Sequence, residues 1–186
     1  TIAPGQSLLV TGPSGVGKSS LMKTLAGLWT TGQGRLTAPP NTLFVPQQPY
    51  LPLGTLQQQL LYPQEAPIVS SELLVQVLEQ VGLPQLAQLS PDTEVDWSQR
   101  LSLGEQQRLS FARVLLQRPA YVILDEATSA VTLEQEQALY QRLVERDITA
   151  VSVGHRESLR LYHAQILTLR PDRTWTLQAQ SDSADV

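Results

Sequence analysis

The sequence contains no cysteine, and it lacks the long apolar and basic segments that mark several protein classes. The missing thiols exclude a disulfide framework, a zinc–thiolate cluster and a cysteine nucleophile. No run of 18 apolar residues occurs, so no transmembrane helix is predicted, and no basic-then-apolar signal segment begins the chain. The net charge of −4 predicts no nucleic-acid partner. The 186 residues, 41% hydrophobic and 16% charged, fit one globular domain with a sizeable core.

Short apolar runs alternate with segments of helical periodicity along the chain. Strands are predicted at 7–10, 42–45, 121–124 and 149–153, followed by a hairpin of 166–169 and 174–177. Helices are predicted at 19–28, 71–81, 104–117 and 133–146. This alternation predicts an α/β fold with a largely parallel sheet, in which residues from about 55 to 118 form a helical insert. The residues after Gln180 are expected to be frayed.

The first strand runs into a phosphate-loop pattern, G-x-x-x-x-G-K-[ST]. The matching residues are Gly12, Pro13, Ser14, Gly15, Val16, Gly17, Lys18 and Ser19, with Ser20 next. The glycines let backbone N–H groups point at phosphate oxygens, and the helix N-terminus adds partial positive charge. We expect Lys18 to reach the β- and γ-phosphates of ATP and to face solvent without a ligand, and Ser19 to bind Mg²⁺. The loop alone does not distinguish a kinase, a GTPase, a helicase and a transporter.

A later apolar strand ends in two acidic residues, Asp125 and Glu126. This position puts both carboxylates at the C-terminal edge of the sheet, where ligands bind in such folds. Asp125 is predicted to hold Mg²⁺, and Glu126 to act as the general base or to orient the attacking water. A lone Asp-Glu pair is more often a helix cap or a solvated turn. The phosphate loop favours the functional interpretation here, because it requires an acidic partner.

Residues 101–108, LSLGEQQR, resemble the LSGGQ signature of ATP-binding cassette (ABC) proteins. In that family the serine hydroxyl and the following backbone N–H groups bind the γ-phosphate of ATP held by the other subunit. The resemblance assigns this role to Ser102, Leu103, Gly104 and Glu105. A Ser-x-Gly turn that opens a helix is chemically suited to an anion. Taken alone, Ser102 and Glu105 equally fit a capping box. Leu103 replaces a usual glycine, and we expect its side chain to point away.

Two more segments are similar to ABC motifs. Residues 45–49 resemble the Q-loop, in which Gln47, or the adjacent Gln48, aligns with the glutamine that senses metal and water. Residues 151–156 resemble the switch-histidine segment, so His155 is expected to contact the γ-phosphate. The resemblance, from Gly5 to about Leu177, implies a RecA-like core with an inserted helical signature subdomain. It implies catalytic roles for Glu126, His155 and Gln47, and Mg²⁺ ligation by Ser19, Gln47 and Asp125.

Finer features resemble subfamily D of the ABC transporters. They are Asp96-Trp97 before the signature and the segments 44–50, 128–132 and 154–163. That group includes peroxisomal acyl-CoA carriers, the lysosomal cobalamin transporter and bacterial relatives fused to an SbmA/BacA-like membrane domain. Residues 109–113 and 152–156 favour the cobalamin-like and bacterial branch. Thr132 departs from most ABC proteins, which carry aspartate there, although subfamily D often has serine or threonine.

The resemblance implies an organisation and partners. Because the chain begins at Thr1 without methionine, we interpret 1–186 as an N-terminally truncated ABC ATPase domain, with the adenine-stacking aromatic upstream. The expected partners are a membrane domain fused upstream and a second copy of the ATPase domain, at the cytoplasmic face of a bacterial inner membrane. A soluble ABC ATPase is the alternative. Repair-type members insert a coiled coil before the signature, whereas only 82 residues without heptads separate Lys18 from Leu101. A non-hydrolysing module and a small-molecule kinase are further rivals, which Glu126, His155 and the signature disfavour.

Overall fold

The computed structural model describes residues 1–39, 41–63 and 69–180, so the frayed end predicted after Gln180 lies outside the described residues. The described residues form a six-stranded sheet of order β2-β3-β4-β1-β5-β6. Its strands are β1 (Leu8–Thr11), β2 (Thr42–Val45), β3 (Tyr121–Asp125), β4 (Thr149–Val153), β5 (Gln165–Leu169) and β6 (Trp175–Ala179). All neighbouring pairs are parallel except the β5–β6 hairpin. The mostly parallel α/β fold predicted from the sequence is therefore confirmed.

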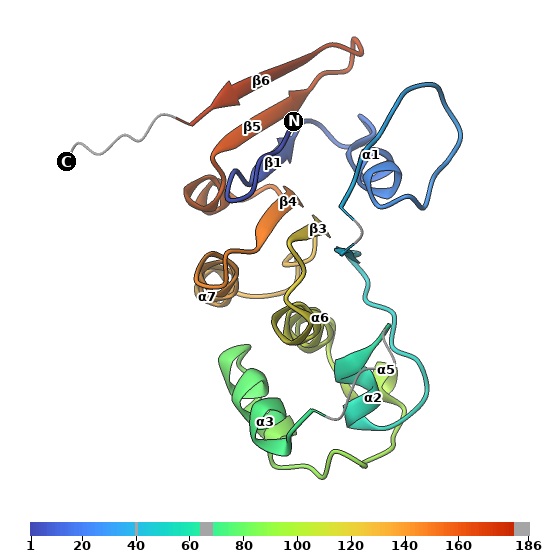
Figure 1. Ribbon diagram of the computed structural model, residues 1–186, viewed down its shortest axis with the longest axis vertical. Coiled ribbons are helices and arrows are strands. Elements are labelled where there is room, and N and C mark those ends of the chain that lie inside the picture. Colours follow the sequence, from blue (N-terminus) through green and yellow to red (C-terminus); the bar gives the residue numbers. More distant parts are fainter. Residues whose placement is uncertain (40, 64–68, 181–186) are drawn as a thin grey trace, which may run out of the picture.

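Helices connect the strands and extend the molecule beyond the sheet. They are α1 (Lys18–Leu25), α2 (Leu56–Leu61), α3 (Ser71–Gln80), α4 (Pro84–Ala87), α5 (Trp97–Arg100), α6 (Leu103–Gln117), α7 (Leu133–Val144) and the 3-10 helix η1 (Glu157–Tyr162). In Figure 1, α2, α3 and α5 gather at the end of the molecule farthest from the β5–β6 hairpin, and α6 lies between them and the sheet. The helical segment between β2 and β3 is thus spatially set apart.

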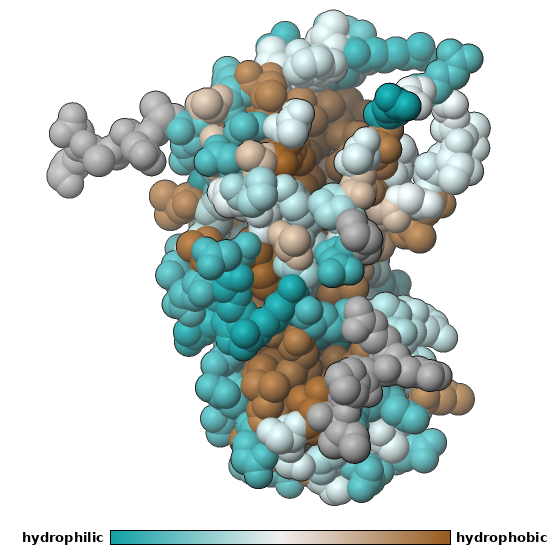
Figure 2. Space-filling model, in the orientation of Figure 1, coloured by the Kyte–Doolittle hydropathy of each residue, from teal (hydrophilic) through white to brown (hydrophobic). Residues whose placement is uncertain are grey.

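Two hydrophobic clusters cover the two faces of the sheet. In β1, Leu9 belongs to the larger cluster while Leu8 and Val10 belong to the smaller one, because successive strand residues point to opposite faces. The smaller cluster contains Met22 of α1, and the larger one contains side chains of α6, α7 and the helices beyond. The larger cluster ends in an apolar hollow of about 160 Å³ between α2, α3 and α4, seen as a hydrophobic patch in Figure 2.

The largest departures from the sequence-based helices concern α1 and α2. The helix expected at 19–28 ends at Leu25, since Gly27 adopts a left-handed φ of 72° and its N–H donates to Thr24 O. Leu28 is then exposed instead of lying on the buried face. Helix α2 was not predicted individually, although its capping box, in which Thr55 and Gln58 bond reciprocally, is visible as a sequence pattern. In both helices the residues at one end, Gly27 after α1 and the capping box of α2, determine where the helix ends or begins.

Candidate nucleotide site

The predicted site residues outside the signature converge at one edge of the sheet. The phosphate loop follows β1, the two acids end β3, and His155 follows β4. These three strands are parallel neighbours, so their carboxyl ends lie together. The edge thereby collects residues that are more than a hundred positions apart in the sequence.

The phosphate loop has the backbone of an anion cradle. Gly12, Gly15 and Gly17 have positive φ angles of 139°, 77° and 102°, which side-chain-bearing residues rarely adopt. A Cβ on Gly12 would lie 2.5 Å from Leu169 O, so glycine is also required there by the approach of β5. Gly17 begins α1 without a side-chain cap, which leaves the first-turn N–H groups for an anion. The loop residues from Pro13 to Val16 border a cavity of about 570 Å³, with the β5–β6 turn on its other side.

Lys18 is buried, which corrects the expectation that it faces solvent without a ligand. Only 6% of the residue is exposed. Its Nζ donates to Gly12 O at 2.9 Å and to Pro13 O at 3.0 Å. A buried ammonium group needs such acceptors, because burial without them is costly. The lysine therefore folds back over its own loop.

Ser19 and Asp125 form the next contact along the edge. Ser19 Oγ donates to Asp125 Oδ1 at 3.0 Å, and Asp125 is 6% exposed. Burial raises the pKa of Asp125, the Ser19 hydrogen bond opposes this effect, and the charge of Glu126 adds to it. A hydroxyl and a carboxylate at this distance are oxygen donors of the kind that Mg²⁺ prefers.

Glu126 lies between the two other predicted catalytic residues. Gln47 Nε2 donates to Glu126 Oε2 at 3.0 Å, and His155 Nε2 lies 3.1 Å from Glu126 Oε1. Of the two glutamines left open by the sequence, Gln47 thus makes the contact with Glu126. The His155 side chain is 60% exposed, so the group faces solvent at the sheet edge. Part of it borders a cavity of about 190 Å³ that extends along the segment after Glu126.

The signature residues lie apart, at the start of α6. Ser102 is the N-cap, and its Oγ accepts from Glu105 N while Ser102 N donates to Glu105 Oε2. The Ser102 hydrogen bonds are the main cause of a lowered Glu105 pKa. The capping box left open by the sequence is therefore present. Leu103 is 42% exposed at the start of α6. Among the described residues, no hydrogen bond joins Ser102–Glu105 to the phosphate loop.

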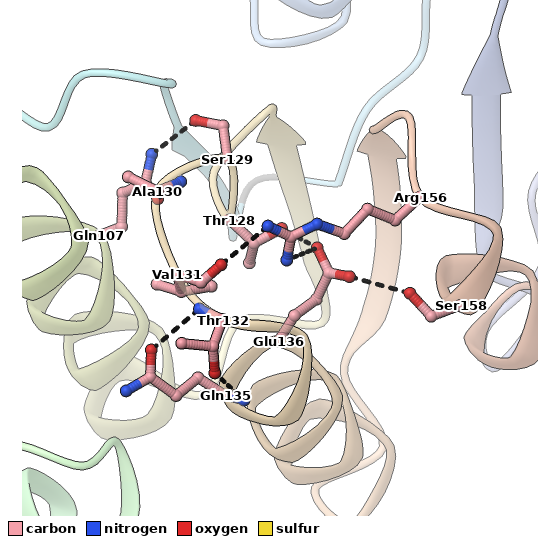
Figure 3. Close-up of polar contacts among 10 residues, drawn as sticks. All are labelled: Gln107, Thr128, Ser129, Ala130, Val131, Thr132, Gln135, Glu136, Arg156 and Ser158. Carbon is pink, nitrogen blue, oxygen red and sulfur yellow. Dashed lines mark hydrogen bonds and ion pairs between the residues drawn. The ribbon is translucent and has the colours of Figure 1, made fainter.

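Sequence reasoning missed a polar network next to the strand end that carries Glu126. Figure 3 shows this network. It joins Gln107 of α6, Glu136 of α7 and Arg156 after β4 to the segment 127–131. Gln107 and Glu136 are 0% and 2% exposed. A signal existed for Gln107, which lies at helical spacing before Phe111 and Val114, and so occupies a core position of α6. Thr132, noted as a departure, is the N-cap of α7 and shares a capping box with Gln135.

Two features are absent from the described part of the chain. No group of three or more histidine, cysteine, aspartate or glutamate side chains is placed to hold a metal ion there. None of the helices in residues 1–39, 41–63 and 69–180 has the length and apolar character needed to span a bilayer.

Known proteins are similar to this chain in sequence and in fold. Residues 1–129 match the family model described as ABC transporter. An uncharacterised ABC transporter ATP-binding protein of Synechocystis is 47% identical over 95% of this chain, and the human lysosomal cobalamin transporter ABCD4 is 42% identical over 95%. The chain spans 27% and 31% of the length of these relatives. Among solved structures, a bacterial Atm1-family ABC exporter with ATP bound matches with a TM-score of 0.76 and 27% identity, over 91% of this chain and 33% of that one.

Proposed function

The chain belongs to the ABC transporter family as an ATP-binding ATPase domain, and from this premise we propose that two copies pair head-to-tail around ATP and drive a membrane domain. Glu126 carries the proposal, because its carboxylate at the phosphate-loop edge lies 3.0 Å from Gln47 Nε2 and 3.1 Å from His155 Nε2. The similarity of the chain to subfamily D transporters and to the Atm1-family exporter supports a role in transport. None of these relatives supports the alternative of a soluble ABC ATPase.

Each residue at the edge has a role that its contacts support. Lys18 exchanges the carbonyls of Gly12 and Pro13 for phosphate oxygens when ATP enters, and its charge offsets theirs. Glu126 accepts the proton of the attacking water. Gln47 and His155 both contact the Glu126 carboxylate and so orient it toward that water. Hydrolysis is therefore assigned to residues that one chain already brings together.

Mg²⁺ fits the donors at this edge. The Ser19 hydroxyl and the Asp125 carboxylate lie 3.0 Å apart and would hold the ion together with the Gln47 amide oxygen. When bound, the ion neutralises phosphate charge. The raised pKa of Asp125 reflects a buried carboxylate that a cation would stabilise in its charged form.

The second copy would supply what one chain does not place at the site. Ser102 and the N–H groups of Leu103, Gly104 and Glu105 start a 15-residue helix, and their exposed end can receive the γ-phosphate of ATP bound to a partner. Glu105 must then release the Ser102 hydroxyl, which now donates to Glu105 Oε2 at 2.7 Å. The signature is thus available for an intermolecular contact.

We place the domain at the cytoplasmic face of a membrane, with a bacterial inner membrane as the specific assignment. The partner is a membrane domain fused upstream, with no nucleic acid involved. Within residues 1–186 we assign about 55–118 to the helical subdomain and the remainder to the RecA-like core. The separation of α2, α3 and α5 from the sheet in Figure 1 supports this division.

The absence of cysteine allows a direct test of the pairing. One chain carries Ser14→Cys and the other Leu103→Cys, both at exposed positions and both in the Glu126→Gln background. With Mg-ATP and an oxidant, we expect a disulfide between the two different chains, because pairing brings the phosphate loop against the signature. Omitting ATP is the control. A disulfide between two Ser14→Cys chains, or equal cross-linking without ATP, would contradict the head-to-tail arrangement.

A further inference from the structure

The segment between Glu126 and α7, residues 127–131, is held from two sides by side chains that have no assigned role. Figure 3 shows Gln107 approaching it from α6 and Arg156 from the loop after β4. We call residues 127–131 the post-Glu126 segment. It is the connection between the carboxylate at the sheet edge and the helix that packs behind it.

Gln107 joins this segment to the loop of Gln47. Its Nε2 donates to Gln47 O at 2.9 Å and to Ser129 Oγ at 3.0 Å, and its Oε1 accepts from Ala130 N at 2.9 Å. Both ends of one fully buried amide are therefore in use. Since Gln47 and Glu126 bond through their side chains, Gln107 ties together the backbones on both sides of that contact.

The signature turn presses on the same segment. A Cβ on Gly104 would lie 2.6 Å from Ala130 O, so only glycine permits this approach of α6. Gly104 and Gln107 are three residues apart on one helix and therefore face the same neighbour. The post-Glu126 segment is therefore packed closely against the start of α6.

Arg156 holds the other side. Its Nη2 donates to Val131 O at 2.8 Å, and its Nη1 lies 3.5 Å from Glu136 Oε2. The buried Glu136 carboxylate also accepts from Thr128 Oγ1 at 2.6 Å and from Ser158 Oγ at 3.0 Å. Because Arg156 follows His155 directly, the loop of the switch histidine is linked to the post-Glu126 segment.

Glu126 needs such support because of its backbone. Its φ is 50°, a left-handed conformation that is uncommon for a residue with a long side chain. Conformations of this kind persist where the surroundings fix them. The adjoining hydrogen bonds, Glu126 N to Val153 O and Ser129 N to Glu126 O, continue directly into the segment that Gln107 holds.

We propose that Gln107 and Arg156 are positioning residues that fix the post-Glu126 segment and thereby hold the Glu126 carboxylate toward Gln47 and His155. The proposal rests on the proposed function, in which Glu126 accepts the proton of the attacking water. Neither residue has a described contact with the phosphate loop, so both should affect turnover and not the binding of ATP.

The test is ATP turnover by the full transporter that carries this domain. Gln107→Leu should lower kcat by roughly tenfold or more, the order expected when reacting groups are displaced by a fraction of an ångström to an ångström, and leave KM for ATP unchanged. Gln117→Leu is the matched control. Gln117 lies at the far end of α6, and its Nε2 likewise donates to two backbone carbonyls, those of Leu61 and Tyr62. It should keep the wild-type kcat.

Arg156→Met provides a second variant should Gln107→Leu fail to fold, since the Arg156 side chain is 37% exposed. Its control is Arg160→Met, which removes an exposed ion pair with Glu157. A lower kcat only for Arg156→Met supports the proposal. Equal kcat within each pair, or a change confined to KM, overturns it. Glu126→Gln, measured alongside, distinguishes failure of the positioning proposal from failure of the proposed function. Turnover that survives this change refutes the proposed function itself.

Discussion

The sheet edge at the phosphate loop is formed by residues from distant segments, whereas the signature turn is formed by neighbouring residues. The edge takes Lys18, Gln47, Glu126 and His155 from four segments, and the parallel sheet brings them together. The signature turn is local, with Ser102 and Glu105 bonded to each other within one turn of α6. In the single chain both regions satisfy their polar groups internally. One chain therefore already brings the residues of the edge together, whereas the turn is bonded only within itself and makes no described hydrogen bond to the phosphate loop.

Substitutions in the two regions should therefore have different effects. A change at the edge alters a set of mutual contacts in one chain, and its effect should appear in binding or turnover at that chain's own ATP. A change at the turn should leave the lone chain able to bind nucleotide and should appear only when two copies meet. The following experiments test that separation.

The largest effect is expected at Glu126. Glu126→Gln keeps the size of the side chain but removes the carboxylate that accepts the proton, so turnover by the full transporter should fall by about a hundredfold or more. ATP should still bind, because Lys18 and Ser19 are unchanged. A phosphate-release assay together with calorimetric titration checks both parts. Turnover close to wild type would show that Glu126 is not the general base.

Lys18→Ala should come next and should act on binding. A charged hydrogen bond contributes about 1.5–3 kcal/mol, so ATP affinity should fall roughly ten- to a hundredfold. Lys23→Ala, an exposed lysine on the same helix, is the control and should bind normally. Calorimetric titration of the chain with Mg-ATP provides the measurement, and equal affinities for the two variants would contradict the role of Lys18.

Behind the exposed edge lies a buried histidine that makes stability depend on pH. Burial lowers the pKa of His163 from 6.5 to about 4, and its ring bonds Leu159 O and Ser152 Oγ. Between these pKa values only the unfolded chain binds the proton, so the stabilisation present above pH 6.5 is lost as pH falls toward 4. The expected loss between pH 7 and pH 5 is about 2 kcal/mol.

Urea unfolding at several pH values measures this dependence. His163→Gln should flatten it, because this change removes the group whose pKa burial lowers. Because Ser152 belongs to β4, acid would loosen the strand that leads to His155. Identical slopes for wild type and His163→Gln would show that other groups cause the pH dependence.

The smallest effect is expected at the signature turn. Ser102→Ala removes the N-cap, which costs about 1 kcal/mol of stability, and should lower turnover of paired copies by roughly tenfold through one lost charge-assisted hydrogen bond. The affinity of the lone chain for ATP should not change. Ser70→Ala, which removes the N-cap of α3, is the control for capping alone. A weaker ATP affinity in the lone Ser102→Ala chain would contradict the prediction that the turn takes no part in ATP binding by a single chain.

The sequence predicted well what short patterns and strand order determine. Asp125 and Glu126 were placed at the ligand-binding edge because parallel strands align their carboxyl ends, and the family resemblance assigned His155 to the same ATP. The orientation of Lys18 was wrong, since a motif does not show that two carbonyls of its own loop can receive the ammonium group. Likewise, the end of α1 depended on the conformation of a single residue, Gly27.

The network behind the edge was missed for a different reason. Gln107 and Ala130 are 23 residues apart, Arg156 and Val131 are 25 apart, and nothing in local periodicity pairs them. Buried polar side chains of this kind are recognisable only as polar residues on an apolar helix face. Their partners depend on how α6 and α7 pack against the sheet, which is a property of the folded chain. The roles assigned to the site residues themselves stay predictions.

The position of β1 has a consequence for synthesis. In the sheet β1 pairs only with β4 and β5, and Ser7 Oγ accepts from Ala150 N, 143 residues later. On the ribosome, the strand that ends in the phosphate loop must therefore wait until most of the chain has been translated. Pairing over such a sequence distance closes a long loop and is intrinsically slow. A nascent chain can thus carry the complete nucleotide motif for several seconds, at roughly 5–20 residues per second, before any neighbouring strand exists to hold it.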